Sequence, residues 1–80
     1  MTTIHRTEVK LGVEFTAPER VTFGYQEERK TFSVWYVNTD TSSVRYIALG
    51  TGWDSQPDLE IVSSFIMPDG FEVYHLCRIK

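Results

Sequence analysis

The residues best suited to bind a partner lie in the stretch 50–60, which follows an apolar run. This stretch opens with Gly-Thr-Gly-Trp-Asp-Ser-Gln-Pro, whose glycines and proline interrupt a β-strand. Its tryptophan, Trp53, lies in a polar loop, where an indole can anchor a protein partner. The nearby carboxylates of Asp54, Asp58 and Glu60 can meet arginine or lysine on that partner. The residue types therefore predict a binding loop.

The glycines of this loop do not complete a phosphate-binding motif. Gly50 and Gly52 lack the third glycine of a dinucleotide fingerprint and the lysine of a P-loop. His75 and Cys77 would point the same way from a strand, but a zinc site needs three or four ligands. We expect His75 to bond the backbone of residues 50–53, and Cys77 to be a small buried apolar residue. The sequence thus predicts no metal and no cofactor.

Groups that could catalyse a reaction do not form a recognisable constellation. Ser63 and Ser64 lack the sequence around them that forms a nucleophile elbow. Asp54, Asp58 and Glu60 could form a carboxylate pair, but acid–base catalysis needs a cleft that perturbs the pKa values. A β domain of this size has little volume for such a cleft. We therefore predict that the chain is not an enzyme.

The chain is short and mildly acidic. Its 80 residues predict a single domain, residues 1–80, with a thin core. Eleven acidic and eight basic residues give a net charge of −3, so we expect no direct binding to nucleic acid. The single cysteine excludes an intrachain disulfide and suits a reducing cytosol. No stretch approaches the roughly 20 apolar residues of a membrane span, and the N-terminus lacks the apolar core of a signal peptide. The expected location is the cytoplasm.

Alternating apolar and polar residues predict an all-β fold with little or no helix. The expected strands cover residues 4–11, 20–26, 31–37, 44–49, 59–67 and 71–79. Residues 31–37 carry large apolar side chains on both faces and should be central, whereas residues 4–11 carry alternating charges and should form an edge. Short polar links predict that the second, third and fourth strands form an antiparallel meander. The predicted fold is a small antiparallel barrel or a two-layer sheet of five to six strands.

Local signals refine this arrangement. Residues 13–15 are a short extended segment, and Gly24 in mid-strand predicts a bulge or a large side chain over bare backbone. Asp58 could cap a short helix, but the β-branched residues that follow favour a strand. Met67-Pro68-Asp69-Gly70 is typical of a tight hairpin turn. Residues 50–57 should form a rigid corner that joins two groups of strands and displays its indole.

The two tryptophans each have two interpretations. Trp53 either folds back as a lid on the core or remains partly exposed as an anchor for a partner. Trp35 is either a core residue or, where its face is open, a platform on which a planar ligand stacks. Aromatic residues on both faces of residues 31–37 are also compatible with a homodimer.

Three short motifs are spread over nearly the whole chain. They are Trp35 in a central strand, the loop Gly50-Thr51-Gly52, and a final strand that contains Val73, Tyr74 and His75. This combination resembles a family of small uncharacterised all-β proteins encoded by bacteriophages, with Tyr74 at a position where that family is expected to have tryptophan. The resemblance implies a phage accessory protein in the host cytoplasm that binds and inhibits a host protein, such as a CRISPR or other immune effector.

The leading functional prediction is therefore a non-enzymatic binding protein of this anti-defence kind. The predicted partner-binding residues are Trp53, Asp54, Gln56, Asp58 and Glu60, with Glu72 and Tyr74 on the adjoining strand. One alternative is a sponge for a nucleotide immune signal, in which glycine N–H groups meet phosphate and an indole stacks on the base. Another alternative is a structural component of the virion or of its assembly.

Overall fold

The chain folds entirely as β-strands and turns in the part that the structure describes. A computed structural model describes residues 1–54 and 58–80, and these ranges contain no helix. The strands are β1 (Ile4–Val9), β2 (Phe15–Ala17), β3 (Thr22–Gln26), β4 (Thr31–Val37), β5 (Val44–Gly50), β6 (Leu59–Ile66) and β7 (Val73–Ile79). The all-β prediction is confirmed, including a strand rather than a helix after Asp58. The predicted number of strands was too low, because β2 was not foreseen as a strand.

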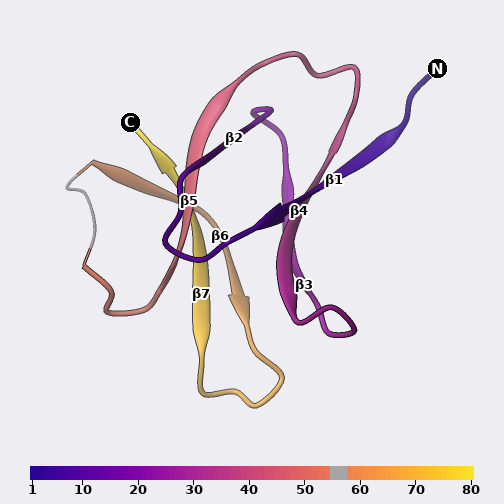
Figure 1. The fold of residues 1–80 in the computed structure, drawn as a ribbon. Coiled ribbons are helices and arrows are strands. Elements are labelled where there is room, and N and C mark those ends of the chain that lie inside the picture. The colour runs from indigo at the N-terminus through magenta and orange to yellow at the C-terminus, as the bar shows by residue number, and fades with distance from the viewer. Residues whose placement is uncertain (55–57) are drawn as a thin grey trace.

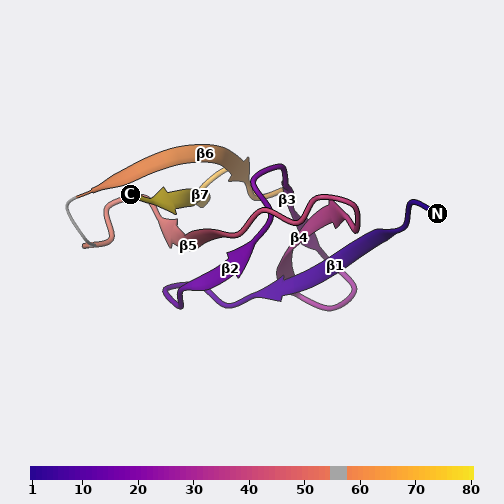
Figure 2. The same cartoon turned by 90° about the horizontal axis from the view of Figure 1, so that it is seen from above.

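The strands form two antiparallel sheets that pack against each other. One sheet has the order β1-β4-β3 and the other has the order β2-β5-β7-β6. Figures 1 and 2 show the two groups next to each other, with β1, β3 and β4 on the right and β5, β6 and β7 on the left. No strand pairing joins the two sheets in the described ranges, so the fold is not a closed barrel. The two-layer version of the predicted fold is the correct one.

The position of β4 explains why the predicted meander is only partly right. As expected, β4 is central, because it pairs with β1 along one edge and with β3 along the other, and β1 is an edge strand. Both edges of β4 are thus occupied, so β5 has no free edge on which to continue the meander. The chain instead crosses to the second sheet, where β5 pairs with β2 and β7. Ser42 N–H donates to Asp40 Oδ1 at 3.0 Å within this crossing, and the Ser42 hydrogen bonds lower the pKa of Asp40.

Both sheets contribute to one hydrophobic core. Its buried members are Val9, Phe23, Phe32 and Val34 from the first sheet and Ala17, Tyr46, Ala48 and Leu76 from the second. Phe32 lies among other rings, with its centroid 5.2 Å from that of Phe23 and 4.9 Å from that of Tyr74. Aromatic side chains bury much area per residue, which helps so short a chain to form a core. Tyr74 therefore connects the core with the surface described below.

Tyr46 holds the short strand β2 and the bend after it. Its ring stacks on Phe15 at 5.6 Å between centroids, and its hydroxyl donates to the carbonyl of Pro18 at 2.8 Å. The carbonyl of Glu19 is a second acceptor at 3.1 Å. Burial raises the pKa of Tyr46, so the phenol remains a hydrogen-bond donor at neutral pH. These contacts hold the segment that leads into β3. Strand propensity alone did not predict them.

Replacing Tyr46 by phenylalanine should reduce the free energy of unfolding by about 1–2 kcal/mol, because the Pro18 carbonyl would lose its partner in the protein interior. Urea unfolding of the variant measures this loss. Tyr36→Phe is a matched control, since the Tyr36 hydroxyl pairs with Thr7 Oγ1 in a partly buried position that water can reach more easily. Equal losses in the two variants would contradict the role given to Tyr46.

Gly24 lies beneath a large side chain, which is one of the two alternatives that its mid-strand position predicted. A Cβ atom at this position would lie 3.3 Å from Cζ3 of Trp35, which faces Gly24 from the neighbouring strand β4. The indole therefore rests on bare backbone of the first sheet. Trp35 is half-buried, so it is neither wholly in the core nor fully open.

Strand β5 ends and strand β6 begins at opposite ends of β7 in the second sheet. Strand β5 ends with Gly50 opposite Tyr74, whereas β6 begins with Leu59 opposite Ile79. These two positions on β7 are separated by about 17 Å at about 3.4 Å per residue. The prediction that residues 50–57 join two groups of strands was wrong. Strands β5 and β6 belong to the same sheet, with β7 between them.

The β6–β7 hairpin has the predicted turn. Gly70 N–H donates to the carbonyl of Met67 at 2.8 Å, and Gly70 has φ +77°, a value that glycine adopts without strain. Strand β7 begins only at Val73, two residues later than predicted. Phe71 consequently lies outside the strand, and its side chain is exposed.

Candidate partner-binding site

A tight turn after β5 places Trp53 over Gly50, the last residue of that strand. Trp53 N–H donates to the carbonyl of Gly50 at 3.2 Å, and Gly52 has φ +85°, which matches the third position of a type II turn. The indole then covers Gly50 so closely that a Cβ atom there would lie 2.7 Å from Trp53 Cε2 and Nε1. The indole can therefore lie over the strand only because residue 50 is glycine and has no side chain.

Trp53 forms one wall of a cleft at the surface of the second sheet. The cleft has a volume of about 340 Å³ and is lined by Gly50, Thr51, Trp53, Phe71, Glu72, Val73 and Tyr74; we call it the aromatic cleft. The ring of Tyr74 stands nearly perpendicular to that of Trp53, at 82° with 6.1 Å between centroids. Trp53 is 49% exposed and Phe71 is 90% exposed. Trp53 is thus held over the end of β5 yet remains accessible, as an anchor residue would be.

The polar side of the aromatic cleft is formed by Glu72 and Tyr74. The Tyr74 hydroxyl donates to Glu72 Oε2 at 2.9 Å. This hydrogen bond to the carboxylate is the main reason that the pKa of Tyr74 lies above its ordinary value, with burial as a further cause. The phenol therefore remains neutral at physiological pH.

A chain of hydrogen bonds holds the turn on β7 and β6. Both the N–H and the hydroxyl of Thr51 donate to the carbonyl of Val73, at 3.1 and 3.2 Å. Thr51 Oγ1 is also hydrogen-bonded to His75 Nε2, 2.8 Å away. The other ring nitrogen, Nδ1, is hydrogen-bonded to Ser64 Oγ at 2.7 Å. His75 therefore links the turn to β6 through both of its ring nitrogens.

The predicted role of His75 was close to the observed one but differs in the partner. His75 does hold the loop, yet it does so through the Thr51 side chain and not through loop backbone, because Thr51 N–H is already bonded to Val73. Cys77 is buried as expected, and burial raises the pKa of its thiol. The described residues contain no cluster of three or more His, Cys, Asp or Glu side chains that could hold a metal ion.

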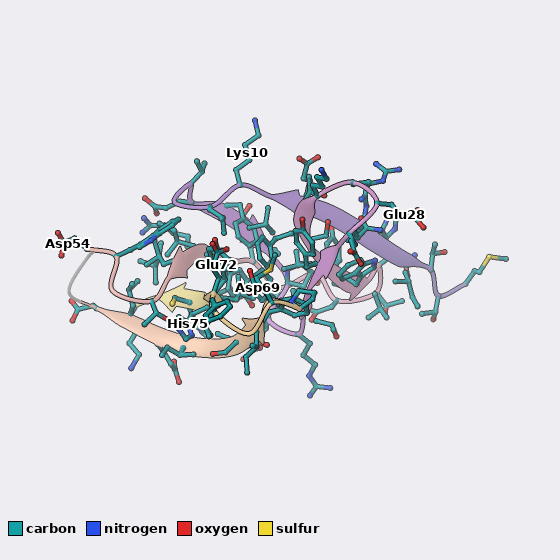
Figure 3. All side chains as sticks on the ribbon, turned by 90° about the horizontal axis from the view of Figure 1, so that it is seen from below. Lys10, Glu28, Asp54, Asp69, Glu72 and His75 are labelled. Atoms are coloured by element: carbon teal, nitrogen blue, oxygen red, sulfur yellow. The ribbon has the colours of Figure 1, made fainter. Side chains whose placement is uncertain are left out.

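Of the predicted partner-binding residues, Trp53, Glu72 and Tyr74 meet in the aromatic cleft. Asp54 is exposed, and Figure 3 shows it at one end of the molecule, apart from Glu72 and Asp69 near the middle. Asp58 and Glu60 lie at the opposite end of β7, where the Asp58 carbonyl accepts from Lys80 N–H at 3.0 Å and Glu60 is opposite Arg78. Gln56 lies outside the described residues.

The acidic residues of the predicted site are therefore not a single cluster. Sequence proximity between residues 53 and 60 suggested one, but the connection carries the chain from the Tyr74 end of β7 to the Ile79 end. Residues close in sequence thus become separated by most of a strand. Glu72 is the carboxylate that remains beside the indole.

Phe71 is the residue of this surface that the sequence interpretation did not single out. It was predicted as the first residue of the strand 71–79, whereas the structure leaves it in the turn before β7. Its N–H donates to Asp69 Oδ1 at 2.9 Å, a bond of the kind that aspartate forms two residues ahead in turns. The Pro-Asp-Gly sequence before Phe71 carried this signal, and it could have shown that the turn extends to residue 71.

A larger cleft of about 560 Å³ lies at the first sheet. It is lined by Ile4, Glu19, Arg20, Val21, Thr22, Trp35, Tyr36 and Val37. Trp35 contributes to its wall, so the platform interpretation of this residue retains a structural basis. Its described lining carries one charge of each sign, on Glu19 and Arg20.

Comparison of the chain with family models, with curated proteins and with solved structures finds no match. The resemblance to bacteriophage proteins therefore stays a prediction from short motifs. Within the described residues, no helix has the length and apolar character needed to cross a membrane.

Proposed function

We propose that this chain is a non-enzymatic protein-binding domain whose contact surface is the aromatic cleft and its rim. The observation that carries the proposal is the 90% exposure of Phe71 beside the half-exposed Trp53. Large apolar side chains that are exposed together in a folded domain commonly mark an interaction surface, and tryptophan is prominent among the residues that dominate binding energy. The charged rim residue Glu72 suits the polar border of such an interface.

The state of the candidate catalytic groups supports a binding role. The ring nitrogens of His75 are both engaged with hydroxyls that hold the Thr51 turn in place. The Cys77 thiol is buried, and its raised pKa favours the protonated form, which is a poor nucleophile. These groups therefore have structural roles that account for their positions.

The motif resemblance described above extends this proposal to the identity of the partner. It places the chain among phage accessory proteins, so the partner would be a host protein, and binding would inhibit it. A defence effector, of the CRISPR type or of another immune system, is the target that this resemblance favours. What supports this extension is the set of motifs at Trp35, residues 50–52 and residues 73–75.

The geometry gives less support to a sponge for nucleotide signals. Two N–H groups of the turn, those of Thr51 and Trp53, are already bonded to the carbonyls of Val73 and Gly50. Among the described residues, those that line the aromatic cleft include no lysine or arginine to meet a phosphate. Thermal unfolding with and without cyclic nucleotides distinguishes this alternative, because a bound ligand raises the melting temperature.

The test of the proposed surface is capture of the partner with a double variant. The immobilised full chain should retain a stoichiometric protein from a lysate of the cells in which it acts. Trp53→Ala combined with Phe71→Ser should lose this protein, because both aromatic anchors are removed. Ile4→Ser is the matched control, since Ile4 is an exposed apolar residue on β1 of the other sheet. Unchanged capture by the double variant, with its fold intact by circular dichroism, would exclude the aromatic cleft as the contact surface.

A further inference from the structure

The walls of the aromatic cleft have the geometry of a cation-binding site. Trp53 and Tyr74 meet at 82°, so their rings form two adjoining walls, and Phe71 contributes a third aromatic group at the rim. The face of an aromatic ring carries negative electrostatic potential, and several rings around one space attract a cation. Tryptophan has the most favourable ring for contact with a cation. The indole of Trp53 is also the ring that lies over Gly50.

The charge of the cleft agrees with this geometry. Glu72 is the one charged side chain among the described lining residues, so the cleft is acidic as well as aromatic. A carboxylate has two acceptor oxygens, and Glu72 uses Oε2 to accept from the Tyr74 hydroxyl. Oε1 can therefore accept from a ligand while Oε2 remains bonded to Tyr74. A cation in the cleft would meet rings on its faces and a carboxylate at its edge.

The walls are held in position before any ligand arrives. The type II turn fixes Trp53 over Gly50, and Thr51 is bonded to Val73 and to His75. Tyr74 is anchored by its contact with Phe32 in the core. A site whose side chains are already ordered loses less conformational entropy on binding. This preorganisation separates the cleft from a chance gathering of surface rings.

We propose that the aromatic cleft receives the guanidinium group of an arginine side chain on the protein partner. This inference rests on the proposed function and names the chemistry of the contact. Guanidinium is planar and weakly hydrated, stacks on aromatic faces, and donates N–H groups to a carboxylate at its edge. A lysine ammonium is compact and strongly hydrated, so it gains less from rings and costs more to desolvate. A volume of about 340 Å³ suits one side chain of the partner.

The test uses the full chain labelled with ¹⁵N and a set of capped tripeptides. Acetyl-Gly-Arg-Gly-amide should shift the indole N–H resonance of Trp53 in a saturable way and leave that of Trp35 unchanged. The citrulline tripeptide has nearly the same shape without the charge, and it should cause no saturable shift. The lysine tripeptide should bind several-fold more weakly. Glu72→Gln should weaken arginine binding about tenfold, because the charge-assisted hydrogen bond would be lost.

Three results would overturn the assignment. They are the absence of a Trp53 shift with the arginine tripeptide, equal binding of citrulline, and equal binding of lysine. The proposed function is judged separately by capture with the Trp53 and Phe71 double variant. If that variant loses the partner while the arginine tripeptide does not bind, the surface stands and the guanidinium assignment fails. If the tripeptide binds while capture is unaffected, the proposed contact surface fails.

Discussion

Replacing Gly50 by alanine is expected to weaken binding at the aromatic cleft at least tenfold, which corresponds to about 1.4 kcal/mol. The new Cβ atom would lie 2.7 Å from two atoms of the Trp53 indole, so the indole must leave its place over the strand. Trp53 is half-exposed and can swing into solvent, so the fold should survive the substitution. Titration of the arginine tripeptide, followed by the Trp53 indole resonance, measures the loss.

The control for this prediction is a glycine that lies under the other tryptophan. Gly24→Ala places a Cβ atom 3.3 Å from the Trp35 ring in the first sheet, so it disturbs an indole without touching the aromatic cleft. Arginine binding should be unchanged in that variant. If Gly50→Ala retained wild-type affinity, the position of the indole over Gly50 would be irrelevant to binding.

The second large effect is expected from Leu76→Ala. Leu76 is fully buried in the centre of β7 and belongs to the core that both sheets share. Leucine-to-alanine substitutions in such positions cost about 2–5 kcal/mol, because transfer free energy is lost and a cavity remains. A chain of 80 residues has a total stability on the order of 4–12 kcal/mol, so the variant should be largely unfolded at the low end of this range.

Urea unfolding measures this effect as a lower midpoint at an unchanged slope. Ile66→Ala on β6 is the matched control, because Ile66 is an exposed aliphatic residue of the same sheet. Its loss should remain below about 1 kcal/mol, the range of strand propensity. A loss of similar size in the two variants would mean that the packing around Leu76 is less tight than the structure indicates.

Much of the fold could be predicted because alternation of apolar and polar residues is a local property of the sequence. The bounds of β4 were predicted in full, and those of β5 and β6 to within one residue. The assignment of strands to sheets could not be predicted in the same way. It depends on which edges are free, and β5 leaves the predicted meander because β1 already occupies the second edge of β4. Strand β2 is three residues long and is held by Tyr46, so propensity did not reveal it.

The candidate site was likewise predicted only in part from the sequence. Trp53, Glu72 and Tyr74 were predicted together and do line one cleft. Asp58 and Glu60 were assigned to it because they follow Trp53 closely in sequence, but the connection carries them to the far end of β7. The fit of the indole on Gly50 and the hydrogen bond between Thr51 and His75 depend on three-dimensional register, which short-range patterns do not contain.

The order of strands in the second sheet has a consequence for biosynthesis. Strand β7 follows β5 and β6 in the sequence, yet it lies between them and pairs with both. While the ribosome is still translating the region before residue 73, the facing edges of β5 and β6 have no partner. Exposed strand edges of this kind favour association between nascent chains. We therefore expect folding to be completed only after residue 79 leaves the exit tunnel, and chaperones that shield unpaired strands to increase the yield of native protein.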